Sequence, residues 1–204
     1  MKYLTNDEVQ RLLVSIDKRA DKVLIQLGLV IGCRVSEIVT IDLKNIQPDR
    51  IKIWDEKKNL FRDVVIDSAT RALLNDFLDD GWEPKPHVKH RLFYFSTKTA
   101  NRILKKYCKK AGIPDDKAHW HTLRHTYVMR SLDEGVPINH IVEQTGDSPS
   151  TIIAIYGRPS IDDRLRVIEN HKLPSQSPVS ITVSKGPVNE DGHNRTVSTE
   201  ERGV

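Results

Sequence analysis

Two arginines, a histidine and a tyrosine have side chains that together can hold a phosphodiester and attack it: Arg34, His121, Arg124 and Tyr156. Cleavage of a phosphodiester without a metal needs cations at the non-bridging oxygens, a nucleophile in line and an acid for the leaving oxygen. A guanidinium fork bonds two phosphate oxygens at once and keeps its charge. These residue types therefore indicate phosphoryl-transfer chemistry that uses neither a metal nor a cofactor.

Each of these residues also has an ordinary structural interpretation when it is taken singly. A lone tyrosine or histidine is more often a packing residue than a catalytic one. Arg34 and Glu37 are spaced as a surface ion pair. The histidines His119, His121 and His125 have metal-ligand spacing, but no cysteine or carboxylate nearby completes a zinc site.

Helix junctions and helix ends are expected to position these side chains. Arg34 lies between an apolar helix over residues 20–32 and a short helix over 34–40, where N-terminal amides favour an anion. His121 and Arg124 are three residues apart in a helix over 120–134 and share a face. Tyr156 stands near the end of a helix over 149–157.

The remaining pattern predicts a mainly α-helical domain with a small antiparallel β-hairpin. Strands are expected over 50–54 and 61–66, and the pattern also allows a short strand over 92–95. Three capping positions stand out, namely Thr5 with Glu8, Ser68, and Ser148 before Pro149. Further helices are expected after Thr5, after Ser68 and over 98–111, 138–145 and 161–171. The domain is predicted to span residues 1–172, and the Pro- and Ser-rich segment 173–204 to be a disordered tail.

Charge is distributed unevenly in a chain of net charge +4. Residues 85–130 hold twelve Lys and Arg against two Asp, the footprint of a polyanion-binding protein, although a solvated helix face would show the same excess. The DNA-binding candidates are Lys58, Lys98, Arg102, Lys105, Lys106, Lys109 and Lys110. The two cysteines, the lack of a signal-peptide pattern and the lack of a membrane-length apolar run favour a cytoplasmic protein.

The combination resembles the tyrosine recombinases, the phage-integrase and Xer-like family. The matching residues are Gly32-x-Arg34-x-Ser36-Glu37, then His121-x-x-Arg124-His125, then Tyr156. The similarity starts at Leu4 and continues to about residue 170, and order, spacing and surroundings all agree. The resemblance implies the tyrosine recombinase catalytic-domain fold and site-specific DNA recombination, such as integration or excision of a viral or plasmid element.

The resemblance also implies a role for each group. Arg34 and Arg124 would clamp the scissile phosphate, and His121 would assist binding and proton transfer. Tyr156 would form a 3′-phosphotyrosyl bond and release a 5′-hydroxyl. A lysine in the hairpin turn would protonate that 5′ oxygen, and Lys57 matches better than Lys58 when counted back from Arg62.

Two departures from the family pattern affect these expectations. Asp147 occupies the place of the usual His or Trp, where a carboxylate would repel a phosphate, so we expect it to orient an arginine, cap the next helix or point away. No core-binding domain precedes residue 4, so either this is a minimal recombinase or a second chain, a host factor or a missing segment completes the DNA clamp. The expected partner is double-stranded DNA, with a monomer in solution and a homotetramer on DNA.

Two other functions remain open. A DNA-binding protein of this fold with weak or lost catalysis would explain Asp147. A type IB topoisomerase-like relaxing enzyme would use the same chemistry without a partner duplex.

Overall fold

The computed structural model describes residues 2–56, 58–80, 90–156 and 165. The chain divides into two units, Met1–Arg158 and Pro159–Val204. All described residues except Leu165 belong to the first unit. The predicted helix over 161–171, the domain boundary at residue 172 and the predicted tail 173–204 lie outside the described residues and stay predictions.

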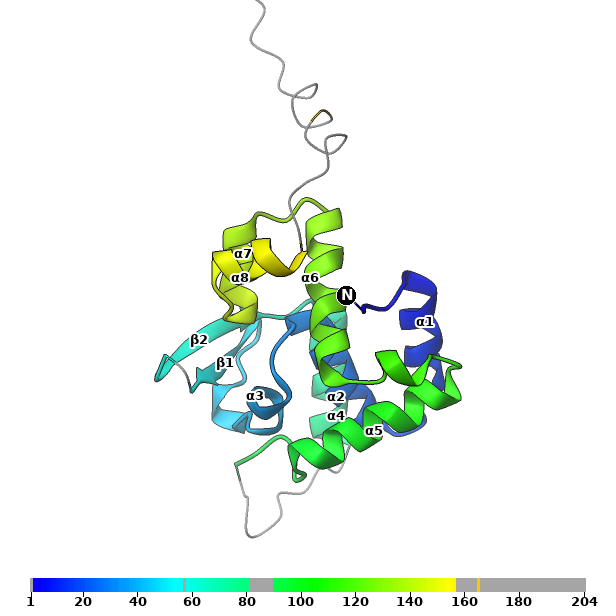
Figure 1. Cartoon of the computed structure of the whole chain (residues 1–204). Coiled ribbons are helices and arrows are strands. Elements are labelled where there is room, and N and C mark those ends of the chain that lie inside the picture. Colours follow the sequence, from blue (N-terminus) through cyan, green and yellow to red (C-terminus); the bar gives the residue numbers. More distant parts are fainter. Residues whose placement is uncertain (1, 57, 81–89, 157–164, 166–204) are drawn as a thin grey trace, which may run out of the picture. The chain divides into compact units, whose positions relative to one another are not determined.

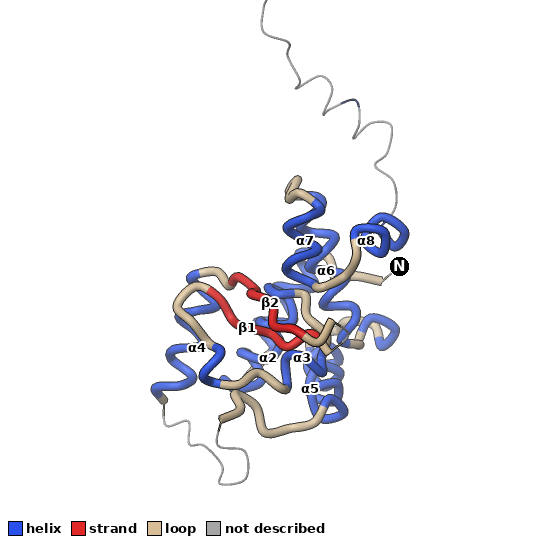
Figure 2. The backbone as a smooth tube through the Cα atoms, turned by 90° about the vertical axis from the view of Figure 1, so that its left-hand side faces the viewer, coloured by secondary structure: helices blue, strands red, loops and turns tan. Residues whose placement is uncertain are grey.

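The first unit is mainly helical and carries one two-stranded antiparallel sheet, which confirms the predicted fold class (Figures 1 and 2). The described helices are α1 (Asn6–Ser15), α2 (Arg19–Ile31), α3 (Val35–Val39), α4 (Ser68–Asp79), α5 (Thr97–Lys110), α6 (Trp120–Asp133), α7 (Ile138–Thr145) and α8 (Pro149–Tyr156). Of two short 3-10 turns, η1 (Leu43–Asn45) follows α3, and η2 (Asp115–Lys117) lies between α5 and α6. The strands are β1 (Arg50–Asp55) and β2 (Leu60–Val65).

Side-chain caps fix where several helices begin. Thr5 and Glu8 form the predicted capping box at α1, and the Ser148 hydroxyl accepts the N–H of Thr151 at 3.1 Å at the start of α8, also as predicted. The predicted cap at Ser68 is wrong by one residue. Asp67 is extended and its carboxylate accepts the N–H of Thr70 at 2.6 Å, so Ser68 is the first helical residue.

The β-hairpin pairs Arg50 with Val65 and Asp55 with Leu60, close to the predicted strands. The suggested strand over 92–95 does not form. An isolated bridge joins Asp42 to Arg91, and the Leu92 N–H donates to the Ile41 carbonyl at 2.9 Å. Leu92 and the next residue are buried in the core, so apolar burial among helices, not sheet pairing, accounts for the apolar character of this segment.

Helix α2 runs through the main core and is buried on most sides, as its apolar sequence predicts. Helix α6 packs against α2, and a smaller cluster of Val128, Ile141 and Ile152 joins α6 to α7 and α8. This packing brings the end of α2, the middle of α6 and the α7–α8 connection together (Figure 1). Within the described part of the chain, no helix has both the length and the apolar character needed to span a membrane.

Candidate phosphate-binding site

A left-handed glycine places Arg34 at the site. Gly32 ends α2 with φ +58°, and a Cβ on it would lie 2.5 Å from the Tyr127 ring. Glycine is therefore the residue that suits both the conformation and the close approach of α6. The chain turns there and Arg34 precedes α3, with its side chain about a quarter exposed (25%).

Helix α6 supplies the second guanidinium from its buried face. The Arg124 side chain is only 5% exposed, and its Nη1 donates to the Gly32 carbonyl oxygen at 2.7 Å. One turn earlier, the Trp120 Nε1 donates to the Cys33 carbonyl oxygen at 3.1 Å. These two bonds tie α6 to the turn that carries Arg34, so both arginines are held by the same junction.

Asp147 lies between the two arginines. Its Oδ1 accepts from Arg34 Nη2 at 3.1 Å, and its Oδ2 accepts from Arg124 Nε at 3.2 Å. Arg124 Nη2 lies 2.5 Å from the same Oδ2 but has no hydrogen-bond partner within the described part of the chain. Of the three possibilities predicted for Asp147, the structure has it pairing with both arginines, and it does not point away.

The buried Glu37 also holds Arg34 in place. The Arg34 N–H donates to Glu37 Oε2 at 2.8 Å and Arg34 Nη1 donates to Oε1 at 3.2 Å. Glu37 is 7% exposed, so the pair is not the ordinary surface ion pair that the spacing allowed. The Arg34 N–H is therefore bound to a carboxylate of the chain itself, and the expectation that amides at the start of this helix favour an external anion stays a prediction.

Arg62 of β2 completes the network and was not among the predicted site residues. Its Nη1 and Nη2 donate to the two oxygens of Glu37 at 3.2 and 3.0 Å, and Nη2 also donates to the Thr145 carbonyl oxygen at 3.2 Å. Cys33 Sγ lies 3.1 Å from Nη2, and burial raises the pKa of its thiol to about 12, so the sulfur is neutral.

Strand alternation contained the signal that would have found this arginine. Ile51, Ile53 and Asp55 share the inward face of β1, and Arg62 and Val64 share that of β2. A charged pair at inward positions of an otherwise apolar face must find partners when it is buried. Arg62 Nη1 lies 3.9 Å from Asp55 Oδ2.

Histidines occupy the outer part of α6. His121 is exposed, and its ring centroid lies 6.4 Å from that of His125. The pKa of His125 is lowered by burial and then by the positive charges of His121 and Arg124. His121 and Arg124 thus come from one helix, as predicted, and His125 favours its neutral form.

The nucleophile and acid candidates are only partly described. Tyr156 is the last residue of α8, but its side chain lies outside the described part, as does the whole of Lys57. Lys58 is exposed in the hairpin turn, and its N–H donates to Asp55 Oδ1 at 3.3 Å. The preference for Lys57 over Lys58 stays a prediction.

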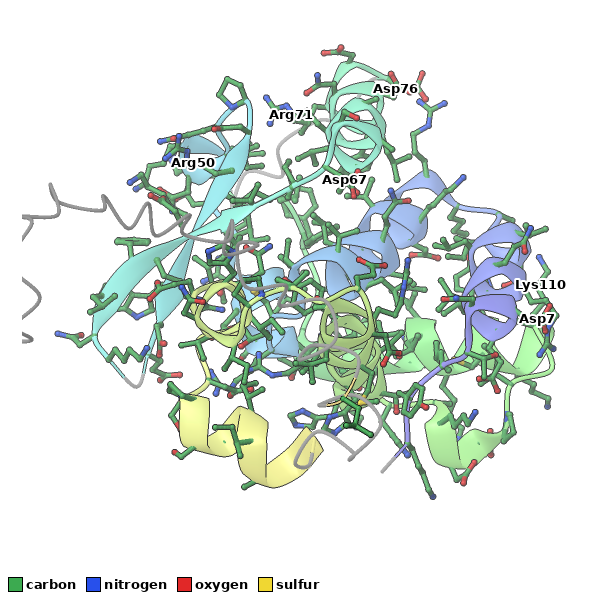
Figure 3. All side chains as sticks on the ribbon, turned by 90° about the horizontal axis from the view of Figure 1, so that it is seen from above. Asp7, Arg50, Asp67, Arg71, Asp76 and Lys110 are labelled. Atoms are coloured by element: carbon green, nitrogen blue, oxygen red, sulfur yellow. The ribbon has the colours of Figure 1, made fainter. Side chains whose placement is uncertain are left out.

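The six basic candidates on α5 are all exposed, but they fall into groups with different surroundings. Lys98, Arg102 and Lys105 line a shallow hollow together with His119. Lys106 and Lys110 instead pair with Asp17 at 3.7 and 3.1 Å, at the edge where α5 meets α1; Figure 3 labels Lys110 there. Among the described residues, no side-chain contact of Lys109 assigns it to either group.

The sequence is similar to those of tyrosine recombinases. The sequence model of the phage integrase family matches residues 2–161. Tyrosine recombinase XerC of Caldanaerobacter subterraneus is 33% identical over 186 residues, which are 85% of this chain and 52% of that protein. Tyrosine recombinase XerA of Pyrococcus furiosus is 28% identical over 184 residues, covering 84% of this chain and 62% of that protein. The chain therefore spans less than two thirds of the length of these relatives.

Solved structures show the same fold. A crystal structure of XerA recombinase aligns with a TM-score of 0.70 at 24% identity, over 85% of this chain and 66% of that one. The catalytic domain of bacteriophage HP1 integrase aligns with a TM-score of 0.59 at 20% identity, over 81% of this chain and 94% of that one. Fold and sequence agree, and the chain belongs to the phage integrase family of tyrosine recombinases.

Proposed function

We propose that this chain is the catalytic domain of a site-specific DNA recombinase that cuts and rejoins DNA through a 3′-phosphotyrosyl intermediate. The relatives named above are tyrosine recombinases, and a solved relative of similar fold, XerH, is described as bound to its difH substrate (TM-score 0.71). The proposed reaction serves integration or excision of a mobile or viral element. It requires no metal and no cofactor.

The observation that carries the proposal is the convergence of Arg34 and Arg124 on one small anion. Each guanidinium donates to a different oxygen of the Asp147 carboxylate, at 3.1 and 3.2 Å. A phosphodiester likewise presents two non-bridging oxygens that share negative charge, so the same pair of forks can hold it. Arg34 also lines an open hollow beside the hairpin, with Ser36, Lys52 and Trp54, where a DNA strand can approach.

The proposed reaction is an in-line exchange at phosphorus. The Tyr156 oxygen bonds to the scissile phosphorus as the bond to the 5′ oxygen breaks, and Lys57 delivers a proton to that oxygen. His121 assists binding and the transfer of the phenolic proton. Arg34 and Arg124 stabilise the charge that gathers on the non-bridging oxygens. Attack by a 5′-hydroxyl of another strand then restores the phosphodiester and the free tyrosine.

Covalent trapping tests this proposal. A pool of nicked duplexes of randomised sequence is incubated with the protein, and DNA that stays attached in denaturing detergent is sequenced. We expect the wild type to retain DNA with or without a chelator, because no metal takes part. Tyr156→Phe lacks the attacking oxygen and is expected to retain none.

Tyr3→Phe is the matched control, because it removes a phenolic oxygen from an exposed tyrosine near the N-terminus. It is expected to trap DNA like the wild type. Equal adduct from wild type and Tyr156→Phe, or an adduct that a chelator abolishes, would contradict the proposal.

Asp147 favours a second candidate, a DNA-binding protein of this fold that cleaves poorly. Its carboxylate already occupies the arginines that the reaction needs. Sequence-specific retention on intact duplex, with no strand cleavage in any nicked substrate, would support this candidate over the recombinase.

Double-stranded DNA is the proposed partner. Recombination joins two duplexes, so we propose a tetramer on DNA with two chains at each site, formed from monomers in solution. Because the chain spans less than two thirds of its curated relatives, a further DNA-binding segment or factor is expected to act with it.

A further inference from the structure

Formal charge in the arginine network cancels. Among the described residues that join it, Arg34, Arg62 and Arg124 face three carboxylates, those of Glu37, Asp55 and Asp147. The Cys33 thiol is neutral, because burial raises its pKa to about 12. Without Asp147 the same network would carry one positive charge, which is the condition that attracts a phosphodiester.

Asp147 differs from the other two carboxylates in how it is held. The side chains of Glu37 and Asp55 are only 6% and 2% exposed. The Asp147 side chain is 14% exposed and belongs to the short connection between α7 and α8. Its own N–H contacts Thr145 Oγ1 at 3.3 Å. Moving this side chain breaks its two ion pairs without opening the apolar core.

Arg124 carries a second sign that Asp147 does not fully satisfy the site. Nη2 of this nearly buried arginine lies against Asp147 Oδ2 but makes no hydrogen bond to any described residue. A hydrogen bond weakens steeply when it is poorly aligned, so this close ion-pair contact leaves Nη2 able to donate to a better-placed oxygen. An anion with more oxygens than a carboxylate, as a phosphate has, can supply the acceptor.

We propose that Asp147 is a positioning residue whose carboxylate occupies the place of the scissile phosphate until DNA displaces it. This inference rests on the proposed function of the site and adds its regulation. In the free protein the carboxylate holds both guanidiniums in the arrangement that a phosphate requires. It also competes with other anions for the two guanidiniums. A carboxylate and a phosphodiester each carry one negative charge, so the exchange of one for the other leaves the total charge at the arginines unchanged. DNA contacts elsewhere on the protein must then favour the exchange.

Binding of inorganic phosphate to the full chain tests this without any need for cleavage. Phosphate affinity is measured by calorimetric titration for the wild type, Asp147→Asn and Asp147→His. Both variants remove the competing carboxylate and leave the arginine network with one uncompensated positive charge, and hydrogen bonds between charged groups are roughly twice as strong as those between neutral groups. We therefore expect phosphate to bind to both variants at least about tenfold more tightly than it binds to the wild type.

Asp63→Asn is the control for charge alone. Asp63 also pairs with two cations, Lys52 at 3.5 Å and Arg50 at 3.8 Å, but it is exposed on the outer face of the hairpin. It is expected to bind phosphate like the wild type. The same gain in Asp63→Asn, or phosphate affinity in the Asp147 variants equal to or below that of the wild type, would overturn the proposal.

Folding of the variants gives a second readout. If Asp147→Asn or Asp147→His unfolds in buffer, recovery of its folded state in phosphate would support the proposal, because the anion then replaces the carboxylate. Failure of both to fold in phosphate would overturn it, since the carboxylate would then be irreplaceable. Neither result depends on Tyr156, so the proposed cleavage reaction can fail while this inference stands, or the reverse.

Discussion

Arg124 makes its contacts in two directions, and both serve the position of Arg34. Nη1 holds the carbonyl of Gly32, which turns the chain toward Arg34, while Nε shares Asp147 with it. A lysine at this position would carry the charge but could not make both bonds from one rigid plane. The geometry therefore explains why the motif needs an arginine here, and not simply a cation.

His125 gives a pH-dependent test at the residue scale. Burial, His121 and Arg124 lower its pKa from the usual 6.5, so the unfolded chain takes up this proton more readily than the folded chain. Its contribution to stability is present above pH 6.5 and is lost as the pH falls through the lower folded value. We expect the free energy of unfolding of the wild type to fall between about pH 7.5 and 5.5.

Urea unfolding at the two pH values measures this loss, and His125→Asn is expected to lose less. His140→Asn, a change at an exposed histidine of α7, is the control and should follow the wild type. A loss in His125→Asn as large as in the wild type would show that other groups account for the pH dependence.

Among the secondary-structure elements, the β-hairpin supports the site because it places Arg62 on its inward face, where the guanidinium binds Glu37. Gly146, with φ +75°, lets the end of α7 approach this arginine, because a Cβ there would lie 3.0 Å from the guanidinium carbon. The hairpin, α3 and α7 thus meet around the buried Arg62. Asp147 is the residue that follows Gly146, so this contact also sets the position of Asp147.

Removal of the buried cation should cost much stability. Arg62→Met leaves buried carboxylates short of a partner, and breaking a buried pair in this way costs about 3–5 kcal/mol. Arg50→Met changes an exposed arginine of the same hairpin, labelled in Figure 3, and should cost less than about 1 kcal/mol. Chemical denaturation measures both. A loss below about 1 kcal/mol for Arg62→Met would mean that the cluster does not hold these elements together.

Sequence periodicity predicted the type of most described elements because each has a strong local pattern. The apolar run of α2, the capping box at Thr5 and the alternation in the hairpin are signals that neighbouring residues set by themselves. The segment around Leu92 and the role of Arg62 were missed, since both depend on partners far along the chain. The pairing of Asp147 with both arginines likewise follows only from the packing of α6 against α2 and α7.

At the scale of the whole molecule, the excess of basic residues predicts salt-sensitive DNA binding, and the structure divides the residues of α5. Arg102 lines the basic hollow with Lys98, whereas Lys110 is paired with Asp17. Each lost phosphate contact makes the negative slope of log affinity against log salt shallower by about 0.9. Arg102→Gln should therefore make the slope shallower by about 0.9, the value for one phosphate contact. Lys110→Gln should leave the slope unchanged.

Fluorescence anisotropy with a random-sequence duplex over a series of NaCl concentrations gives these slopes. If Lys110→Gln made the slope shallower by as much as Arg102→Gln does, the hollow lined by Lys98 and Arg102 would not be the face of α5 that contacts DNA.

The mass of the protein–DNA adduct identifies the residue that attacks the DNA. Trapped protein is digested with trypsin and nuclease, and the peptide that carries a nucleotide is sequenced by mass spectrometry. We expect a nucleotide joined through its 3′ phosphate to residues 131–164, a tryptic peptide in which Tyr156 is the only tyrosine. The released strand should end in a 5′-hydroxyl. A nucleotide on any other residue, or one joined through its 5′ phosphate, would contradict the proposal that Tyr156 forms a 3′-phosphotyrosyl bond.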